Sequence, residues 1–258
     1  MKNIQKIVLL FIALAFSYPG SSQDSLTNEL RYEVNRTYPS ISIAKEKLKE
    51  AHTLIDLNEA NNLHLHYRPA WIREYISVEI SASNKGILRK AVSENDTLSQ
   101  EQKDIMNMAD VGTDISVNIQ YIPENTLKHN DAKEIDFKFT VNPESEAIYA
   151  GGQQQLKQYL KENAIDKIPT GSFKGYDLAA VKFTINEEGK IIDAHIFGPE
   201  FQTSKDEKID KLLLETICNM PNWKPAEYAN GTKVKQEFVL TVGNMENCVI
   251  PLLNIRQD

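Results

Sequence analysis

The chain has 258 residues, of which 41% are hydrophobic and 25% are charged, and its formal net charge is -7. This balance is typical of a globular protein with one large domain or two small ones. Binding to nucleic acid needs clustered lysine and arginine, so a chain with this acidic balance is not expected to bind DNA or RNA.

The first 22 residues have the pattern of a secretion signal. Lys2 and Lys6 give a positive start, residues 7–16 are apolar, and small residues follow up to Ser22. An apolar run of this length is too short for a membrane-spanning helix, which needs about 20 residues. We therefore expect a cleaved signal peptide over 1–22, no stable membrane span, and a periplasmic protein, with secretion or peripheral attachment to the envelope as further options. A weakly anchoring, uncleaved signal is the alternative.

Residues 23–70 are predicted to form a helical lead-in. Apolar residues at helical spacing favour one helix over 41–57, and the alternation in 63–67 favours a short strand. His64 and His66 would share a face of that strand. Two histidines without a third ligand are weak evidence for a metal, so no metal site is expected.

From residue 71 onward the same pattern of elements occurs twice. In 71–142 it runs as strand 76–81, strand 87–92, a helix after the capping box at Ser99, and strand 115–121, with a further strand over 134–141. The second occurrence has strands 181–185 and 192–196, a helix after Ser204, and a closing strand over 233–242. The two copies have low identity, so duplication and shared architecture both remain open.

A proline-bounded tryptophan separates the last helix from the closing strand. The helical run 205–220 ends at Pro221, because a proline nitrogen cannot continue the hydrogen-bond ladder. Trp223 then lies between Pro221 and Pro225, and Asn230-Gly231 marks a turn before the strand. We expect Trp223 to close the end of a core between helices and sheet.

Residues 147–246 resemble the C-terminal domain of TonB-type energy transducers, in the form common in Bacteroidetes. The resemblance depends on the joint spacing of a helix, a hairpin, the tryptophan motif and the final strand. The residues that carry it, each with an expected structural role, are Gly151, Gly152, Pro169, Gly189, Pro221, Trp223, Pro225 and Gly231. Ile168 stands where the family usually has an aromatic residue.

The resemblance implies an α+β fold with a small antiparallel sheet covered by two helices, preceded here by a second β-β-α-β domain. The expected layout is a signal peptide over 1–22, the lead-in over 23–70, the first domain over 71–142, the TonB-like domain over 147–246, and a tail over 247–258. If the sheet is antiparallel, the closing strand should lie beside the first strand of its unit and present a free edge.

The function implied by the resemblance is capture of a short segment of an outer-membrane receptor, which adds as a strand to the sheet edge. The expected edge residues are Lys233, Lys235, Glu237, Val239 and Thr241. Other envelope proteins and a second copy of the chain are further possible partners. Because no spanning helix or long spacer is recognised, we expect a binding module linked to TonB-dependent transport rather than a complete motor. A structural component of an envelope, secretion or motility assembly is the alternative.

Catalysis and cofactors are not expected. The sequence has no G-x-S-x-G, HExxH or P-loop motif. In an exported protein, Cys218 and Cys248 could form a disulfide. Alternatively, Cys218 is a core thiol on the last helix and Cys248 is a separate thiol in the tail.

Overall fold

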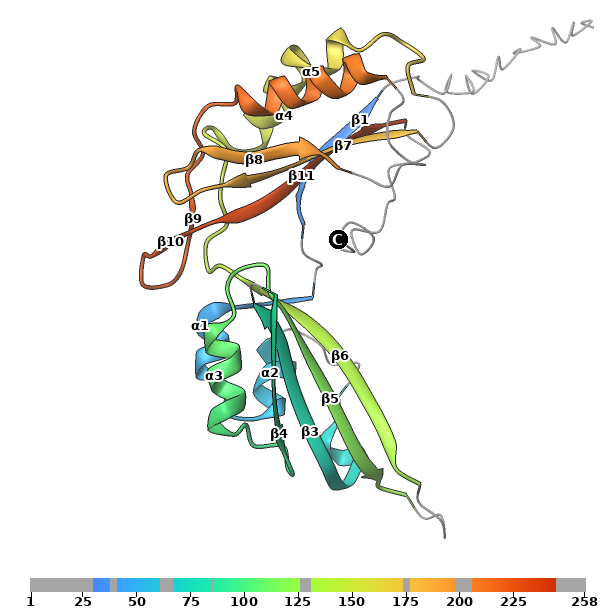
Figure 1. Ribbon diagram of the computed structural model, residues 1–258, viewed down its shortest axis with the longest axis vertical. Coiled ribbons are helices and arrows are strands. Elements are labelled where there is room, and N and C mark those ends of the chain that lie inside the picture. The colour runs from blue at the N-terminus through green and yellow to red at the C-terminus, as the bar shows by residue number, and fades with distance from the viewer. Residues whose placement is uncertain are drawn as a thin grey trace, which may run out of the picture.

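The computed structural model describes residues 30–37, 41–60, 67–84, 86–125, 131–173, 177–197 and 206–244 (Figure 1). The expected signal peptide 1–22, His64, His66, the tail 247–258 and Cys248 all lie outside these residues. The described chain is an α+β protein with two lobes, each built on its own sheet (Figure 1). None of its described helices is long and apolar enough to cross a membrane.

The N-terminal lobe has a five-stranded sheet with helices packed on one face. Its strand order is β2-β6-β5-β3-β4, with only β2 parallel to its neighbour. The elements are β2 (Ser42–Ala44), α1 (Lys45–Glu50), α2 (Leu54–Ala60), β3 (Ile72–Asn84), β4 (Ile87–Ser93), α3 (Gln100–Met108), β5 (Asp114–Pro123) and β6 (Lys133–Asn142). Alternate residues of β3, β5 and β6 form one apolar core with the helices.

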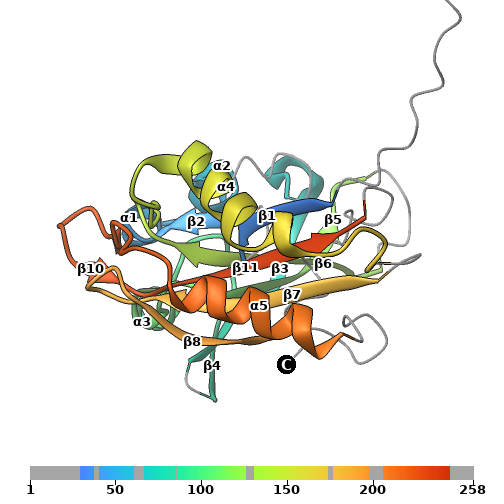
Figure 2. The same cartoon turned by 90° about the horizontal axis from the view of Figure 1, so that it is seen from above.

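The C-terminal lobe has a four-stranded antiparallel sheet of order β1-β11-β7-β8. Its two long helices cover one face of this sheet (Figure 2). The elements are β1 (Arg31–Arg36), α4 (Gly152–Asn163), β7 (Leu178–Ile185), β8 (Ile191–Ile196), α5 (Glu207–Cys218) and β11 (Gln236–Gly243), with β9 (Ala226–Glu227) and β10 (Lys233–Val234) forming a small separate ladder.

The repeated pattern is confirmed as a repeated topology. In each lobe a hairpin is followed by a helix that returns the chain to the free side of the hairpin's first strand. This gives the order β4-β3-β5 in one lobe and β8-β7-β11 in the other. The expected capping box of α3 is present, with the Ser99 hydroxyl accepting from the Gln102 amide and the Gln102 side chain accepting from the Ser99 amide. Helix α5 is capped by Asp206, and residues 201–205, which include Ser204, lie outside the described chain.

The predicted lead-in is not a separate segment. Strand β1 belongs to the sheet of the C-terminal lobe, whereas β2, α1 and α2 belong to the N-terminal lobe. The single helix expected over 41–57 is also wrong, because the chain forms β2 and two short helices there. The break between the helices comes from tertiary pairing. Thr53 bridges Thr97, the Leu54 amide donates to the Asp96 carbonyl, and the Leu98 amide donates to the His52 carbonyl.

Glu144 ties the two lobes together from the connector between them, which is residues 143–146. One carboxylate oxygen accepts from the backbone amide of Glu46 in α1, and the other accepts from the amide of Ala229 in the C-terminal lobe at 3.0 Å. The adjoining Ser145 exchanges two backbone hydrogen bonds with Glu227. The lobes are therefore held closely together.

A buried lysine completes the end of α3. Lys45 is 6% exposed, and its Nζ donates to the carbonyls of Met106, Asn107 and Ala109 at 3.1, 2.7 and 2.5 Å. Helix C-termini leave carbonyls without intrahelical partners, and a cation suits the negative end of the helix. Burial lowers the pKa of Lys45, although Asp110 opposes this shift.

The tryptophan motif packs directly against the β7–β8 turn. The Trp223 ring makes edge contacts with Tyr149 and Phe183, and its amide donates to the Gly189 carbonyl at 2.8 Å. Gly189 has φ of 79°, and a Cβ placed on it would lie 1.9 Å from the Trp223 carbonyl oxygen. A side chain is thus excluded at Gly189 both by its backbone conformation and by the tryptophan segment. The expected role of Trp223 in the core is confirmed, since it is 4% exposed.

Replacing Lys45 should destabilise the N-terminal lobe. Lys45→Met keeps an unbranched side chain but leaves the α3 carbonyls without their donor, so we expect a loss of about 2–3 kcal/mol in the free energy of unfolding. Lys47→Met, on the exposed face of the same helix, should change it by less than about 0.5 kcal/mol. Urea denaturation measures both variants. Equal values for the two would show that the buried cap contributes nothing.

Two variants separate the effect of the close contact at Gly189 on stability from the effect of its backbone conformation. Gly231 has nearly the same φ, 78°, but open space around its Cβ position. We expect Gly231→Ala to cost about 1 kcal/mol of unfolding free energy and Gly189→Ala about 3 kcal/mol, because only the latter also clashes with backbone. Thermal and urea unfolding give the two values. A Gly189→Ala cost no larger than that of Gly231→Ala would contradict the proposed packing.

Candidate functional site

The closing strand lies inside the sheet, so the expectation that it presents a free edge is wrong. As predicted, β11 lies beside β7, with Phe238 opposite Phe183. Its other side, however, pairs antiparallel with β1 along residues 31–36, which brings Val34 opposite Leu240. The sheet position expected for a partner strand is therefore filled by a segment from about 200 residues earlier in the same chain.

The residues predicted for partner binding do not form one accessible row. Lys233 lies on β10, and Lys235 lies between β10 and β11. Glu237 faces the side of the sheet away from the helices, where it forms an ion pair with Lys182 at 3.1 Å. Val239 is completely buried and Thr241 pairs with Glu33 of β1.

Strand β1, which fills the edge, is held by contacts at its two ends and by the packing of its apolar face. Tyr32 and Val34 are partly buried against the C-terminal core, and the Tyr32 hydroxyl donates to the Lys157 carbonyl of α4 at 3.2 Å. At the other end Arg36 forms an ion pair with Glu146 of the connector. The Thr37 amide donates to the Glu237 carbonyl at 3.3 Å, which extends the pairing by one residue.

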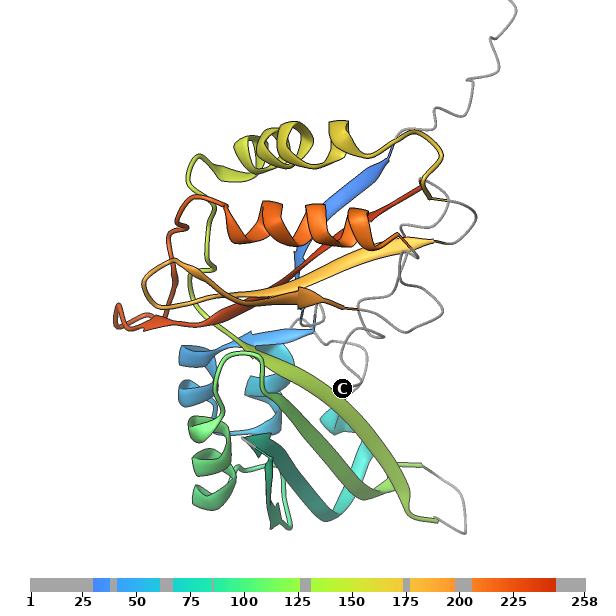
Figure 3. The same ribbon diagram turned by 45° about the horizontal axis from the view of Figure 1, so that its top comes forward.

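A groove separates part of β1 from α4, which lies alongside it in Figure 3. It has a volume of about 240 Å³ and is lined by residues 32–35 of β1 and by Gln153, Leu156, Lys157 and Leu160 of α4. Both leucines are 1% exposed and belong to the core. The two leucines lie beneath the groove, and its accessible lining combines polar and apolar side chains, with Val34 among them.

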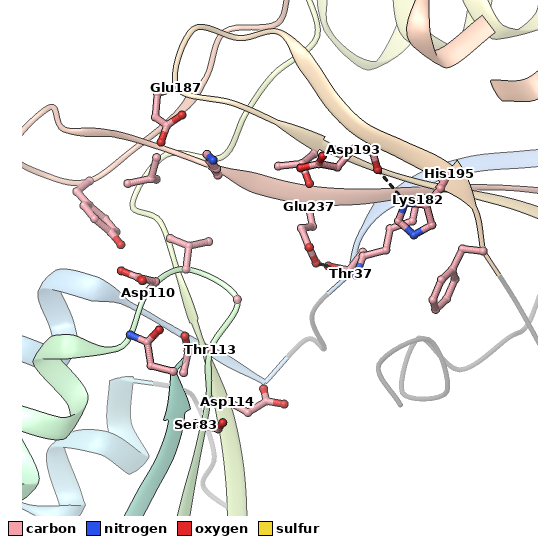
Figure 4. A pocket seen from close by; sticks show the side chains of 18 of the residues that line it. Thr37, Ser83, Asp110, Thr113, Asp114, Lys182, Glu187, Asp193, His195 and Glu237 are labelled. Carbon is pink, nitrogen blue, oxygen red and sulfur yellow. Dashed lines mark hydrogen bonds and ion pairs between the residues drawn. The ribbon is translucent and has the colours of Figure 1, made fainter. Parts of the chain in front are cut away.

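A second, larger cavity lies between the lobes (Figure 4). Its volume is about 1370 Å³, and acidic side chains from both lobes, such as Asp110 and Glu237, line it together with Lys182 and His195. His195 Nδ1 lies 2.8 Å from the carbonyl oxygen of Asp193. The described residues contain no group of three or more side chains placed to hold a metal ion. The cavity is a wide polar cleft, and no particular chemistry follows from its lining.

The other residues of the motif have structural positions. Gly151 and Gly152 have φ of 90° and 77° where the chain enters α4, and Pro169 is exposed just after the turn of 3-10 helix Ile165–Lys167. Pro221 is exposed after the end of α5, and Pro225 is buried beside Trp223. These residues shape the C-terminal lobe.

The two cysteines are not both described. Cys218 is the last residue of α5 and is exposed, so the interpretation that it is a core thiol is wrong. The buried apolar stripe of α5 contains Ile209, Leu213 and Ile217. Each helical residue turns by about 100°, and Cys218 consequently faces solvent. Because Cys248 lies outside the described residues, the disulfide remains a prediction.

Sequence reasoning missed β1. Its sequence, Arg31-Tyr32-Glu33-Val34-Asn35-Arg36, alternates polar and apolar residues over only two apolar positions. Such a short run is a weak strand signal. This alternation is the only local indication of the strand, and no local sequence pattern identifies β11 as the strand that pairs with it.

Comparisons of the chain with family models, with curated proteins and with solved structures give no match.

Proposed function

We propose that this protein is a periplasmic protein-binding module of the TonB C-terminal type, which binds extended segments of outer-membrane receptors by strand addition in TonB-dependent transport. The observation that carries the proposal is the pairing of β1 with β11. The sheet of the C-terminal lobe accepts, beside its closing strand, a short extended segment that is remote in the sequence. Strand addition needs such an edge, with backbone bonds for affinity and pockets for alternate side chains.

The opposite end of the sheet suits strand addition less well. β8 is the other outer strand, but its pairing with β7 shifts register between Lys182 and Thr184. Asp193 within it has φ of 53°, which is unusual for a residue other than glycine. Such irregularities interrupt the regular ladder that an added strand would extend. The proposal therefore assigns partner binding to the β11 side.

The proposal predicts binding that depends on the backbone of the partner. The probe is a synthetic peptide from the periplasmic N-terminal segment of a TonB-dependent receptor, titrated into the full mature chain by calorimetry. A control peptide has proline at alternate positions and cannot donate the same backbone hydrogen bonds. We expect the control to bind roughly tenfold more weakly or worse, a difference of about 1.4 kcal/mol. Equal binding of both peptides, or no binding of either, would contradict strand addition.

A scaffolding role is the second candidate, and it is favoured by one observation in the N-terminal lobe. β4 is an outer strand of seven residues in unbroken register with β3. Three of its apolar side chains, Ile87, Leu88 and Val92, are 60%, 68% and 52% exposed. A regular, apolar outer strand presents unpaired backbone groups that can pair with another chain.

The two candidates differ in which lobe binds. A scaffold that assembles through β4 should lose its stable complex in Leu88→Glu/Val92→Glu, as measured by crosslinking in whole cells. Receptor-segment binding by the C-terminal lobe should not change in that variant. Loss of receptor-segment binding in the β4 variant would show that the C-terminal lobe is not the binding lobe.

A further inference from the structure

We propose that β1 is an internal occupant of the partner-binding position on β11, and that the partner displaces it. The partner assigned here is an extended segment of another protein, with an aromatic or large aliphatic residue at the position of Val34. The identity of the partner rests on the proposed function, but the exchange of β1 can be tested without that partner.

β1 contributes little buried surface to its sheet. None of its six side chains is buried, whereas its neighbour β11 and the central strand β7 are buried at most positions. Its attachment includes a backbone ladder, the half-buried side chains of Tyr32 and Val34, and polar contacts at Tyr32, Arg36 and Thr37. Removal of β1 would uncover the side of β11 but would leave the core between β7, β11 and the helices in place. The strand is thus suited to exchange.

The groove beside α4 indicates which side chains a partner would offer. On β1 the residues that face α4 are Tyr32 and Val34, opposite Val242 and Leu240 of β11. The groove above Leu156 and Leu160 is only partly filled by Val34. A larger apolar side chain at that position would fill more of the groove and bury more of its own apolar surface, and burial of apolar area is favourable by about 25 cal/mol per Å². A partner can therefore bind β11 more tightly than β1 does.

One end of the site favours a positively charged residue in the partner. Glu146 of the connector receives Arg36 at the end of β1, two residues after Val34. Along a strand, residues i and i+2 lie on the same face, so this spacing sets the register of an incoming segment. The fitting segment has a large apolar residue followed at i+2 by arginine or lysine.

An internal occupant lowers the apparent affinity of the partner. The apparent Kd equals the intrinsic Kd divided by the fraction of molecules in which β11 is open. Opening of β1 should consequently tighten binding, and covalent retention of β1 should abolish it. A chain that is open in about one molecule in ten would gain roughly tenfold in affinity when β1 is loosened.

The experiment uses the mature chain in three forms. In the opened form, Tyr32→Asp/Val34→Asp removes the apolar contacts of β1. In the locked form, Glu33→Cys/Thr241→Cys joins two residues that lie opposite each other on β1 and β11, in a Cys218→Ser/Cys248→Ser background. Oxidised and reduced samples of the locked form are the same polypeptide, so their comparison does not depend on how a variant folds. Circular dichroism and Tm check the opened form.

The first probe is a fluorescent peptide with the chain's own residues 30–37, and the second is the same peptide with Val34→Phe. We expect both to bind the opened form, the Phe peptide more tightly, and wild type roughly tenfold more weakly. The reduced locked form should bind like wild type, and the oxidised form should not bind. Equal binding by the oxidised and reduced forms would overturn the exchange, because the peptide would then pair elsewhere.

The receptor segment is titrated directly by calorimetry into the oxidised and the reduced locked form, and this separates the two proposals. Receptor binding that is lost in the oxidised form supports both. Peptide exchange as expected, with no binding of the receptor segment, would overturn the proposed function and the receptor as partner while the exchange of β1 stands. Receptor binding that is equal in the oxidised and reduced forms would keep the proposed function and overturn the displacement. A dimer present only in the reduced form, measured by light scattering, would identify a second copy as the occupant and overturn the assignment of a separate partner.

Discussion

The pairing between β1 and β11 is the constraint on which the functional interpretation of this molecule depends. A sheet edge has unpaired amide and carbonyl groups, and these groups can pair with an extended segment that reaches them. Here the segment is supplied by the chain itself, from the far end of its sequence. The N-terminal lobe begins only a few residues further along the chain, since β1 ends at Arg36 and β2 begins at Ser42. Occupation of the edge and the joining of the lobes are therefore linked in one segment.

The N-terminal lobe provides an internal comparison for that edge. Four of its five strands follow the order β4-β3-β5-β6, with β2 beyond β6, and those of the C-terminal lobe follow β8-β7-β11-β1. The position beside the third strand of the unit is filled in both lobes. In the N-terminal lobe, β6 fills it as the next strand along the chain and contributes the buried Phe139 and Val141. In the C-terminal lobe, β1 fills it with no buried side chain. The strand beside the third strand of the unit is thus well buried in the N-terminal lobe and little buried in the C-terminal lobe.

The residues that give the sequence its resemblance to TonB-type domains have a shared physical role. They fix the turn, the helix entry and the tryptophan segment around one core. Gly189 lies so close to the backbone of Trp223 that a side chain at position 189 would not fit between them. The turn itself is held by Asn186, whose side-chain oxygen accepts from the amides of Glu188 and Lys190. These features define the shape of the lobe, whereas the proposed binding depends on the backbone of β11, which carries no sequence motif.

The sequence by itself determined the elements whose signals are local. The alternating strands 76–81 and 181–185, the capping box at Ser99 and the stop at Pro221 all arise within a few residues, and the structure contains each of them. The topology of each unit also followed, because a helical crossover leaves few arrangements. Only the tertiary structure decided the break of the expected helix 41–57, the exposure of Cys218 and the neighbour of β11. Each of these depends on contacts between distant segments, as in the bridge from Thr53 to Thr97 and the ladder from β1 to β11. A strand edge is satisfied by backbone groups that every residue carries, so the sequence of β11 contains no mark of what will pair with it.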